Sequence, residues 1–325
     1  MRNFKLAQPK TIAQAVALLK QDSESRVLMA GGTDLLDELK SGIIQPDTVI
    51  DLSTLTDGHD IRQDKDVIRI GALAKVALLA EASPIQEYFP GLREAALSLA
   101  TPQLRNMGTV GGNLCQRPRC WYYRDPQAAC RKKGGSRCYA FRGRNRYHAI
   151  FGGGICHIVF PSDLAPSLIS LDAEVTITSP EGDRRMPLEE LYALPSADVR
   201  RETVLEPGEV LKEVAVPLPK AGTKSTYLKI KERGTWDFAV VSVALNAVVV
   251  GGIFQDVRIV CGGVAPVPWR MAQAEGHLKG KRVTEDLLRE AARKDLAQAR
   301  PLEENAYKAD LLETAVYRAG LSVLG

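Results

Sequence analysis

Five of the six cysteines in this 325-residue sequence lie between residues 115 and 156. Their positions are Cys115, Cys120, Cys130, Cys138 and Cys156. Cysteine thiolates bind zinc ions and iron–sulfur clusters. The thiols of a cytosolic protein stay reduced, so clustered cysteines there favour a metal centre over disulfide bonds.

The spacing of these cysteines limits the kind of metal centre. Intervals of nine, seven and seventeen residues separate Cys120, Cys130, Cys138 and Cys156. These intervals match neither ferredoxin signature and are wider than those of an ordinary zinc ribbon. The residues alone therefore leave three possibilities open: an iron–sulfur cluster, a structural zinc ion, or unrelated buried thiols. Cys115 is a fifth candidate ligand, whereas the isolated Cys261 is expected in the core.

Two glycine-rich segments precede the cysteines, at residues 30–34 (AGGTD) and 108–113 (GTVGGN). Glycines allow backbone N–H groups to approach phosphate oxygens closely. Neither segment fits G-x-G-x-x-G or carries a Walker lysine, which disfavours a Rossmann fold and a P-loop. With Asn113 and Asp163 nearby, the two segments predict a nucleotide cofactor close to the metal centre, an arrangement suited to electron transfer.

The elements around the first glycine segment follow from apolar periodicity. A capping box at Thr11 and Gln14 begins a predicted helix with apolar residues at positions 12, 15, 16, 18 and 19. Residues 26–30 predict a strand and residues 34–40 a helical turn, and a strand, glycine turn and helix in that order suit a phosphate contact. Further strands are expected at 49–52, 67–70 and 174–178, and further helices from 83, from 90 to about 100, and from 162.

Residues 114–157 show little periodicity. A segment of this length without regular structure is uncommon in a compact domain unless something else organises it, and a bound metal centre would do so. Beyond a linker marked by Pro217, Pro219 and Gly222, the pattern predicts a β-meander followed by two helices. Its strands are expected at 227–231, 238–250 and 253–260, and its helices near 284–298 and 305–322.

The positive charge of the chain is concentrated in the cysteine segment. Residues 101–150 hold eleven Lys or Arg and one acid, Asp125, whereas the whole chain has a net charge of only +4. Such a patch suits nucleic acid, an anionic cluster and cofactor, or an acidic partner protein. Because the charge is not spread along a helix face, the last two roles are favoured and nucleic-acid binding is not expected.

Other side chains indicate no catalysis on this chain. We find no Ser-His-Asp or paired-carboxylate arrangement, so no catalytic residue is predicted. His148 and His157 flank the cysteine segment and are expected to be hydrogen-bonded or surface histidines rather than ligands. The run of aromatic side chains at Trp121, Tyr122 and Tyr123 is expected to shield a cofactor or line a subunit interface.

No apolar run approaches the length of a membrane span, so membrane insertion is not expected. The first residues lack the apolar core of a signal peptide, which predicts a cytoplasmic protein. An export signal on a partner subunit would instead place a folded complex in the periplasm.

Five motifs together resemble one known family. They are AGGTDLL at 30–36, GTVGGN at 108–113, PSDLAP at 161–166, WDFA at 236–239 and GGVAP at 262–266. In this order they are similar to the FAD-binding medium subunit of molybdenum hydroxylases, which include xanthine dehydrogenase, carbon monoxide dehydrogenase and aldehyde oxidoreductase. The resemblance implies an α+β fold, with a two-subdomain FAD-binding domain at residues 1–218. A smaller C-terminal domain of a three-stranded sheet and helices would occupy residues 219–325.

The cysteine segment, at 114–157, resembles an insertion in 4-hydroxybenzoyl-CoA reductase and in some bacterial aldehyde oxidoreductases, whose flavin subunit carries an extra [4Fe–4S] cluster. By that similarity the ligands are Cys120, Cys130, Cys138 and Cys156. Cys115 lies in a motif, NLCQ, that recurs in relatives whose first ligand is a later cysteine, so it is not expected to be a ligand. Residues 119–125 (RCWYYRD) resemble the aldehyde oxidoreductase branch, and the expected substrate is an aldehyde or an aromatic compound.

The resemblance also implies the FAD contacts. One set surrounds the pyrophosphate: Leu28, Met29, Ala30, Gly31, Gly32, Thr33, Asp34 and Leu35. A second set is Thr109, Val110, Gly111, Gly112 and Asn113. Asp163 would contact the ribityl or nucleotide portion, and Leu211 and Lys229 would lie near the flavin ring. Lys231 is an alternative to Lys229, because alternate residues of a strand face the same side.

The implied function is that of an FAD and [4Fe–4S] electron-transfer subunit. Its partners would be a large subunit with a molybdenum (or tungsten) cofactor, a small [2Fe–2S] subunit and an external electron acceptor or donor. Two other interpretations of the residues remain. One is a self-contained flavin oxidoreductase with a structural zinc site, and the other is a zinc module that binds nucleic acid through residues 117–146.

Overall fold

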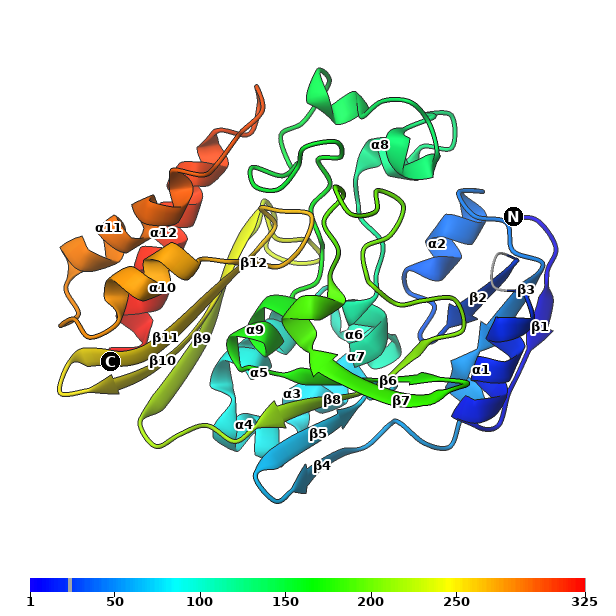
Figure 1. Ribbon diagram of the computed structural model, residues 1–325, viewed down its shortest axis with the longest axis horizontal. Coiled ribbons are helices and arrows are strands. Elements are labelled where there is room, and N and C mark those ends of the chain that lie inside the picture. The colour runs from blue at the N-terminus through cyan, green and yellow to red at the C-terminus, as the bar shows by residue number, and fades with distance from the viewer. Residues whose placement is uncertain (23–24, 325) are drawn as a thin grey trace.

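The computed structural model describes residues 1–22 and 25–324. Residues 23 and 24 of the first predicted domain and residue 325 of the second lie outside the described residues. Three sheets lie one after another along the long axis of the molecule, and the two termini lie at opposite ends (Figure 1). The cysteine segment lies above the middle sheet in this view, between α2 on one side and the C-terminal helices on the other.

The first sheet is parallel and has the order β1-β3-β2. Its strands are β1 (Lys5–Ala7), β2 (Arg26–Met29) and β3 (Thr48–Asp51). Helix α1 (Ile12–Gln21) begins at a Thr11 cap and buries Ala15, Val16 and Leu19. Helix α2 (Leu35–Lys40) follows β2 directly after the glycine turn. The predicted helix and the predicted strand, turn and helix are therefore confirmed.

The second sheet is antiparallel and forms the middle of the molecule, with the order β4-β5-β8-β6-β7. Its strands are β4 (Ile61–Asp64), β5 (Val67–Gly71), β6 (Glu174–Ser179), β7 (Gly182–Pro187) and β8 (Val210–Pro217). The helices that follow β5 along the chain are α3 (Val76–Glu81), α4 (Ser83–Tyr88), α5 (Pro90–Ser98), α6 (Pro102–Met107) and α7 (Val110–Leu114). Buried apolar side chains of this sheet, of several of these helices and of α9 (Leu164–Ser170) form one hydrophobic cluster.

The third sheet corrects the predicted three-stranded meander. It has four antiparallel strands: β9 (Thr223–Ile230), β10 (Val241–Val250), β11 (Ile253–Gly262) and β12 (Trp269–Arg270). The two-residue β12 is too short to show an alternating pattern. Helix α10 (Ala272–Leu278) was also not predicted, whereas α11 (Glu285–Leu296) and α12 (Tyr307–Ser322) were.

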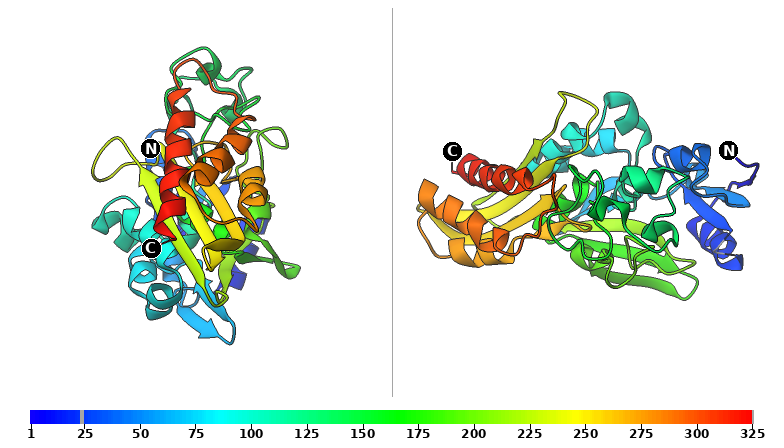
Figure 2. Two further views of the ribbon diagram at one scale, coloured as in Figure 1. Left: turned by 90° about the vertical axis from the view of Figure 1, so that its left-hand side faces the viewer. Right: turned by 90° about the horizontal axis from the view of Figure 1, so that it is seen from above.

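Helices cover both faces of this third sheet. Helices α11 and α12 lie on its outer side (Figure 2), and α5 and α9 contact its strands from the second sheet. Gly91 of α5 approaches β9 so closely that a Cβ there would lie 2.8 Å from the Thr226 nitrogen. The Glu94 carboxylate accepts a 2.7 Å hydrogen bond from the Tyr227 N–H. The third sheet is therefore packed tightly against the helices of the second.

The cysteine segment is largely irregular, as predicted. Its regular elements are α8 (Trp121–Arg124) and the 3₁₀ turns η2 (Arg131–Lys133) and η3 (Tyr139–Phe141). None of the helices in the described part of the chain has the length and apolar character needed to cross a membrane.

The loop before α12 and the first residues of that helix hold the second half of this segment. We name residues 299–308 the C-terminal strap. Asn145 and Glu304 exchange two hydrogen bonds of 2.7 and 2.9 Å. The Asn305 amide donates to the His148 carbonyl at 3.0 Å, and the Lys308 Nζ donates to the Tyr147 carbonyl at 2.9 Å. The C-terminal domain thus fixes the backbone on both sides of His148.

Lys308 is fully buried, and its Nζ also donates to the Gly263 carbonyl at 2.7 Å. Burial lowers the pKa of Lys308 from 10.5 to about 7. Between about pH 7 and pH 10.5, Lys308 is protonated in the unfolded chain and largely neutral in the folded chain. The contribution of Lys308 to the free energy of unfolding therefore increases as pH rises. The slope is at most about 1.4 kcal/mol per pH unit.

We therefore expect the free energy of unfolding of the wild type, minus that of Lys308→Met, to increase from pH 7 to pH 9. Urea unfolding at constant ionic strength measures both values. A difference that stays constant over this range would contradict the titration of Lys308.

Candidate cofactor and cysteine sites

The structure brings the two glycine segments together. Gly31 lies so close to the chain before the second segment that a Cβ on it would overlap the Met107 carbonyl oxygen. Gly32 has a φ of +70°, which an L side chain rarely adopts. Both positions therefore require glycine, one for close backbone approach and the other for its conformation.

The first glycine segment presents unused donors. Within the described residues, the N–H groups of Gly31, Gly32, Thr33 and Asp34 donate to no other group of the chain. Successive backbone N–H groups around a turn form an anion-binding concavity. This turn is therefore suited to hold a phosphate or pyrophosphate group.

The second glycine segment differs from the predicted loop. Residues 110–114 form the short helix α7, with Thr109 as its cap. The N–H groups of Val110 and Gly111 donate to the carbonyls of Ala74 and Ala72, and that of Gly112 donates to Thr109 Oγ1 at 3.0 Å. Because these donors are satisfied inside the chain, this segment offers a ligand chiefly the side-chain-free surface of its glycines and the side chains of Thr109 and Asn113.

Two cavities border these segments. Cavity A has a volume of about 430 Å³ and is lined by residues 27–35, Thr109, Gly111, Gly112 and Leu211. Cavity B, of about 370 Å³, is lined by Thr109, Gly112, Asn113, Asp163 and Phe238 among others. The two share five lining residues: Thr33, Asp34, Thr109, Gly112 and Gln116. All the predicted cofactor residues except Val110 and Lys229 line one cavity or both.

Lys229 is placed by an ion pair with another predicted residue. Its Nζ lies 2.8 Å from Asp163 Oδ2, and the Tyr227 hydroxyl donates to Asp163 Oδ1 at 2.7 Å. Burial raises the pKa of Asp163, and the charge of Lys229 opposes that rise. The pair links β9 to the start of α9, next to Asn113, which accepts a 2.6 Å hydrogen bond from Ser162.

The four predicted ligand cysteines line one small cavity, the cysteine cavity. Three of them directly precede a helical turn: Cys120 before α8, Cys130 before η2 and Cys138 before η3. Backbone N–H groups of Tyr122 and Tyr123 donate to Cys120. Because N–H groups at the start of a turn favour a thiolate, these positions suit metal-bound sulfur.

Two of these four cysteines, Cys138 and Cys156, lie within hydrogen-bonding reach of each other. The other two thiols of the chain lie outside this cavity. Cys115 lines cavity A, and Cys261 is buried in β11. In the described part of the chain, no group of three or more His, Cys, Asp or Glu side chains is arranged to hold a single metal ion. Burial raises the pKa of the Cys120 thiol to about 11, so metal binding there would release a proton.

The basic side chains of the cysteine segment pair with acids elsewhere in the predicted FAD-binding domain, which the sequence analysis did not predict. The Asp34 carboxylate binds the guanidinium groups of Arg119 and, at 2.7 Å, Arg124, and it accepts a 2.7 Å hydrogen bond from the Arg117 N–H. Burial alone would raise the pKa of Asp34, but these arginines hold it below its usual value.

A second acid, Glu202, is also buried against this segment. It binds Arg117 at 2.7 Å and the buried Lys132. The cysteine segment is therefore held against the glycine turn by ion pairs of low exposure. The only feature of the sequence that pointed to these ion pairs was the concentration of positive charge in residues 101–150.

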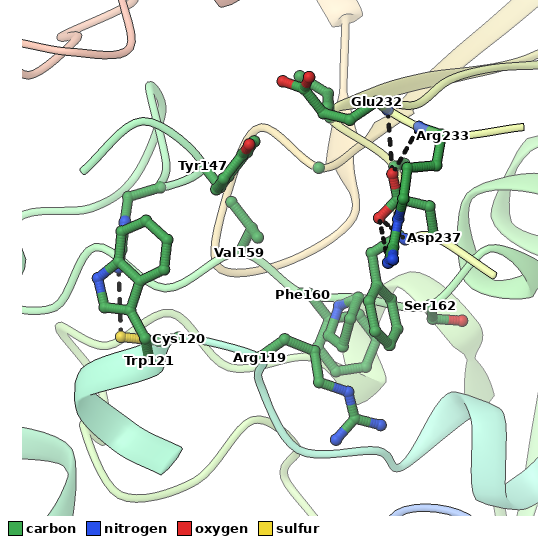
Figure 3. A pocket seen from close by; sticks show the side chains of 16 residues that line it. Arg119, Cys120, Trp121, Tyr147, Val159, Phe160, Ser162, Glu232, Arg233 and Asp237 are labelled. Atoms are coloured by element: carbon green, nitrogen blue, oxygen red, sulfur yellow. Dashed lines mark hydrogen bonds and ion pairs between the residues drawn. The ribbon is translucent and has the colours of Figure 1, made fainter. Parts of the chain in front are cut away.

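A third cavity, cavity C, is shown in Figure 3 and shares lining residues with both sites. It has a volume of about 450 Å³. Cys120 and Trp121 lie on one side of it, and Arg233 and Asp237 lie on the other. It shares Arg119, Pro161, Asp237 and Phe238 with cavity B, and Cys120 and His148 with the cysteine cavity. Sequence reasoning did not identify this cavity.

Comparison with protein families gives two matches. Residues 2–129 and 142–219 match the family described as FAD binding domain in molybdopterin dehydrogenase. Residues 225–323 match the family described as CO dehydrogenase flavoprotein C-terminal domain. The first match omits residues 130–141, which contain Cys130 and Cys138.

Individual proteins are similar over nearly the whole chain. The aldehyde oxidoreductase FAD-binding subunit PaoB of Escherichia coli strain K12 is 36% identical over 312 residues, covering 95% of this chain and 94% of that protein. The carbon monoxide dehydrogenase medium chain of Hydrogenophaga pseudoflava is 28% identical over 308 residues, covering 94% and 91%. In the solved carbon monoxide dehydrogenase from Hydrogenophaga pseudoflava, a chain of 28% identity has a TM-score of 0.79 and the match covers 99% of this chain and 98% of that one. These likenesses confirm the predicted fold class.

We expect Gly31→Ala to weaken flavin binding, because its Cβ would displace the turn that presents the free N–H groups. A displacement that costs about 1.4 kcal/mol weakens binding about ten-fold. Flavin absorbance of the purified protein after dialysis measures the change. Gly276→Ala is the control, since a Cβ there meets nothing within 4 Å; equal flavin retention in both variants would contradict the role of the turn.

Proposed function

The chain belongs to the family of FAD-binding medium subunits of molybdenum hydroxylases, and from this premise we propose that it carries electrons through FAD and a [4Fe–4S] cluster. Its relatives are named as oxidoreductase or dehydrogenase subunits, so it is an oxidoreductase subunit. Flavin exchanges electrons in pairs, whereas an iron–sulfur cluster exchanges them singly.

The free donors of the first glycine turn support a specific FAD arrangement. The N–H groups of Gly31, Gly32, Thr33 and Asp34 would bind the pyrophosphate, as part of the predicted set from Leu28 to Leu35. The set from Thr109 to Asn113 would pack against the cofactor between cavities A and B. Asp163, Leu211 and Lys229 would complete the site. A cation such as Lys229 near the flavin ring would favour an anionic reduced ring.

The observation that carries the proposal for the cluster is that four cysteines of an irregular segment line one buried cavity. The four thiols come from separate stretches of the chain and converge on this one cavity, as the ligands of a single cluster would. Arg131 and Lys132 line the same cavity, and their positive charge would offset part of the charge of the thiolates. Cys130 and Cys138 lie in the stretch outside the family match, as expected of an addition that serves this chain.

The relation of the cavities supports electron transfer between the two centres. Cavity C borders both cavity B and Cys120, so a flavin in cavity B and a cluster at the cysteines would face the same space. We assign the domains as residues 1–218, with the cysteine segment at 114–157, and residues 219–325. The boundary falls in the connection between β8 and β9.

The chain is the FAD-binding subunit of a heteromeric enzyme. Its partners in the proposal are a large subunit with the molybdenum cofactor, a small [2Fe–2S] subunit and an external electron acceptor or donor. The substrate would be oxidised or reduced on the large subunit, so no side chain here needs to act on it. The 36% identity to an aldehyde oxidoreductase subunit favours an aldehyde as that substrate.

Cys130→Ser tests the ligand assignment, because it removes one of the four thiolates from the buried cavity. We expect the anaerobically purified wild type to contain FAD and about four irons per chain. The variant should lose most of the iron and keep the FAD. Metal analysis and the absorption spectrum measure both.

Cys115→Ser is the matched control, since its sulfur lines cavity A and not the cysteine cavity. It should keep the full iron content. Full iron in Cys130→Ser, or a wild type that holds zinc instead of iron, would contradict the assignment.

A further inference from the structure

We propose that His148 is a positioning residue that donates a hydrogen bond from Nε2 to the Cys120 thiolate and thereby raises the reduction potential of the cluster. The inference rests on the proposed function, because it requires Cys120 to be a cluster ligand.

The geometry places the ring on the sulfur. His148 Nε2 lies 3.2 Å from Cys120 Sγ, and the His148 side chain is buried. A cluster-bound thiolate has no proton to share, so the hydrogen between the two atoms must belong to the nitrogen. Hydrogen bonds to ligand sulfur withdraw charge from it and stabilise the more negative, reduced cluster.

The ring is held in place from several sides. It packs against Trp121 and Tyr122, at centroid distances of 5.5 and 6.1 Å. The His148 N–H donates to the Asn145 carbonyl at 2.9 Å, and its carbonyl accepts from the fully buried Asn305 of the C-terminal strap at 3.0 Å. The position of Nε2 is therefore set by the fold and not by chance contact with the sulfur.

Among the described residues, the contact with Cys120 Sγ is the only hydrogen bond that the His148 ring makes. Within the described residues, the buried His148 Nδ1 has no hydrogen-bond partner. A buried polar atom without a partner is destabilising, and an apolar side chain packed against the same aromatic rings would avoid that cost. The bond to Cys120 is the interaction that distinguishes histidine from such a side chain.

Cys120 also has a distinct position among the four cysteines. It lines cavity C as well as the cysteine cavity, and His148 does the same. The hydrogen-bonded thiolate is thus the one on the side of the proposed flavin site. Tuning this sulfur would affect the part of the cluster nearest the electron donor or acceptor.

His157 offers a matched control. It is buried in the same segment next to Cys156, and its ring stacks on Phe141 at a centroid distance of 5.8 Å. Both of its ring nitrogens lack a hydrogen-bond partner among the described residues. Replacing this ring changes packing near the cluster without removing a bond from a ring to sulfur.

The test compares His148→Met, His148→Gln and His157→Met in the complex purified with its partner subunits under anaerobic conditions. Gln can place an amide N–H near the position of Nε2, whereas Met, of similar length, has no donor. The midpoint potential of the cluster is measured by a redox titration followed by electron paramagnetic resonance. Resonance Raman spectra measure the iron–thiolate stretching bands.

We expect His148→Met to lower the midpoint potential and raise an iron–thiolate frequency, with iron and FAD content unchanged. His148→Gln should bring the potential and the frequency part of the way back to the wild-type values, and His157→Met should leave both at those values.

An unchanged potential in an iron-replete His148→Met, or an equal shift in His157→Met, would overturn the role of His148. If His148→Met loses the cluster, His148→Gln decides: a lost cluster there too overturns the inference, and a retained one near the wild-type potential supports it. A wild type without iron would instead refute the proposed function.

Discussion

The carboxylate of Asp34 joins the two halves of the site. It follows the glycine turn, whose residues line cavities A and B, and it binds Arg119, Arg124 and the Arg117 N–H of the cysteine segment. The side chain of Asp34 is only 18% exposed, so removing one partner would leave a poorly solvated charge without its counter-ion, which is destabilising. The glycine turn and the cysteine segment therefore cannot shift independently.

This constraint explains the distribution of charge. The basic excess of residues 101–150 is met by acids from distant parts of the chain, Asp34 and Glu202 among them. Arg117 contacts both acids, with its backbone N–H on Asp34 and its guanidinium on Glu202. The arginines serve first to attach an irregular segment to a regular scaffold. Their positive charge near the thiols follows from that attachment.

The sequence predicted what depends on local patterns. The Thr11 cap, the strand before Gly31 and the irregular character of residues 114–157 all follow from neighbouring residues, and the structure has each of them. The second glycine segment shows where local patterns fail. It resembles the first in composition, yet its N–H groups are occupied because Ala72 and Ala74 lie beside it. A contact between residues more than thirty positions apart in the sequence decides which segment keeps free donors, and a short motif cannot predict such a contact.

The role of the C-terminal domain could not be predicted for the same reason, because its contacts with the cysteine segment are distant in the sequence. Asn305 and Lys308 lie at the start of the helix predicted near 305–322, and they donate to the carbonyls of His148 and Tyr147 more than 150 residues earlier. Carbonyls of an irregular segment have no strand or helix to satisfy them, and burying them without donors would be costly. The strap provides those donors. An irregular cysteine segment is therefore stable in one conformation because two domains supply what regular secondary structure would otherwise supply: Asp34 and Glu202 neutralise its charges, and residues 299–308 satisfy its backbone.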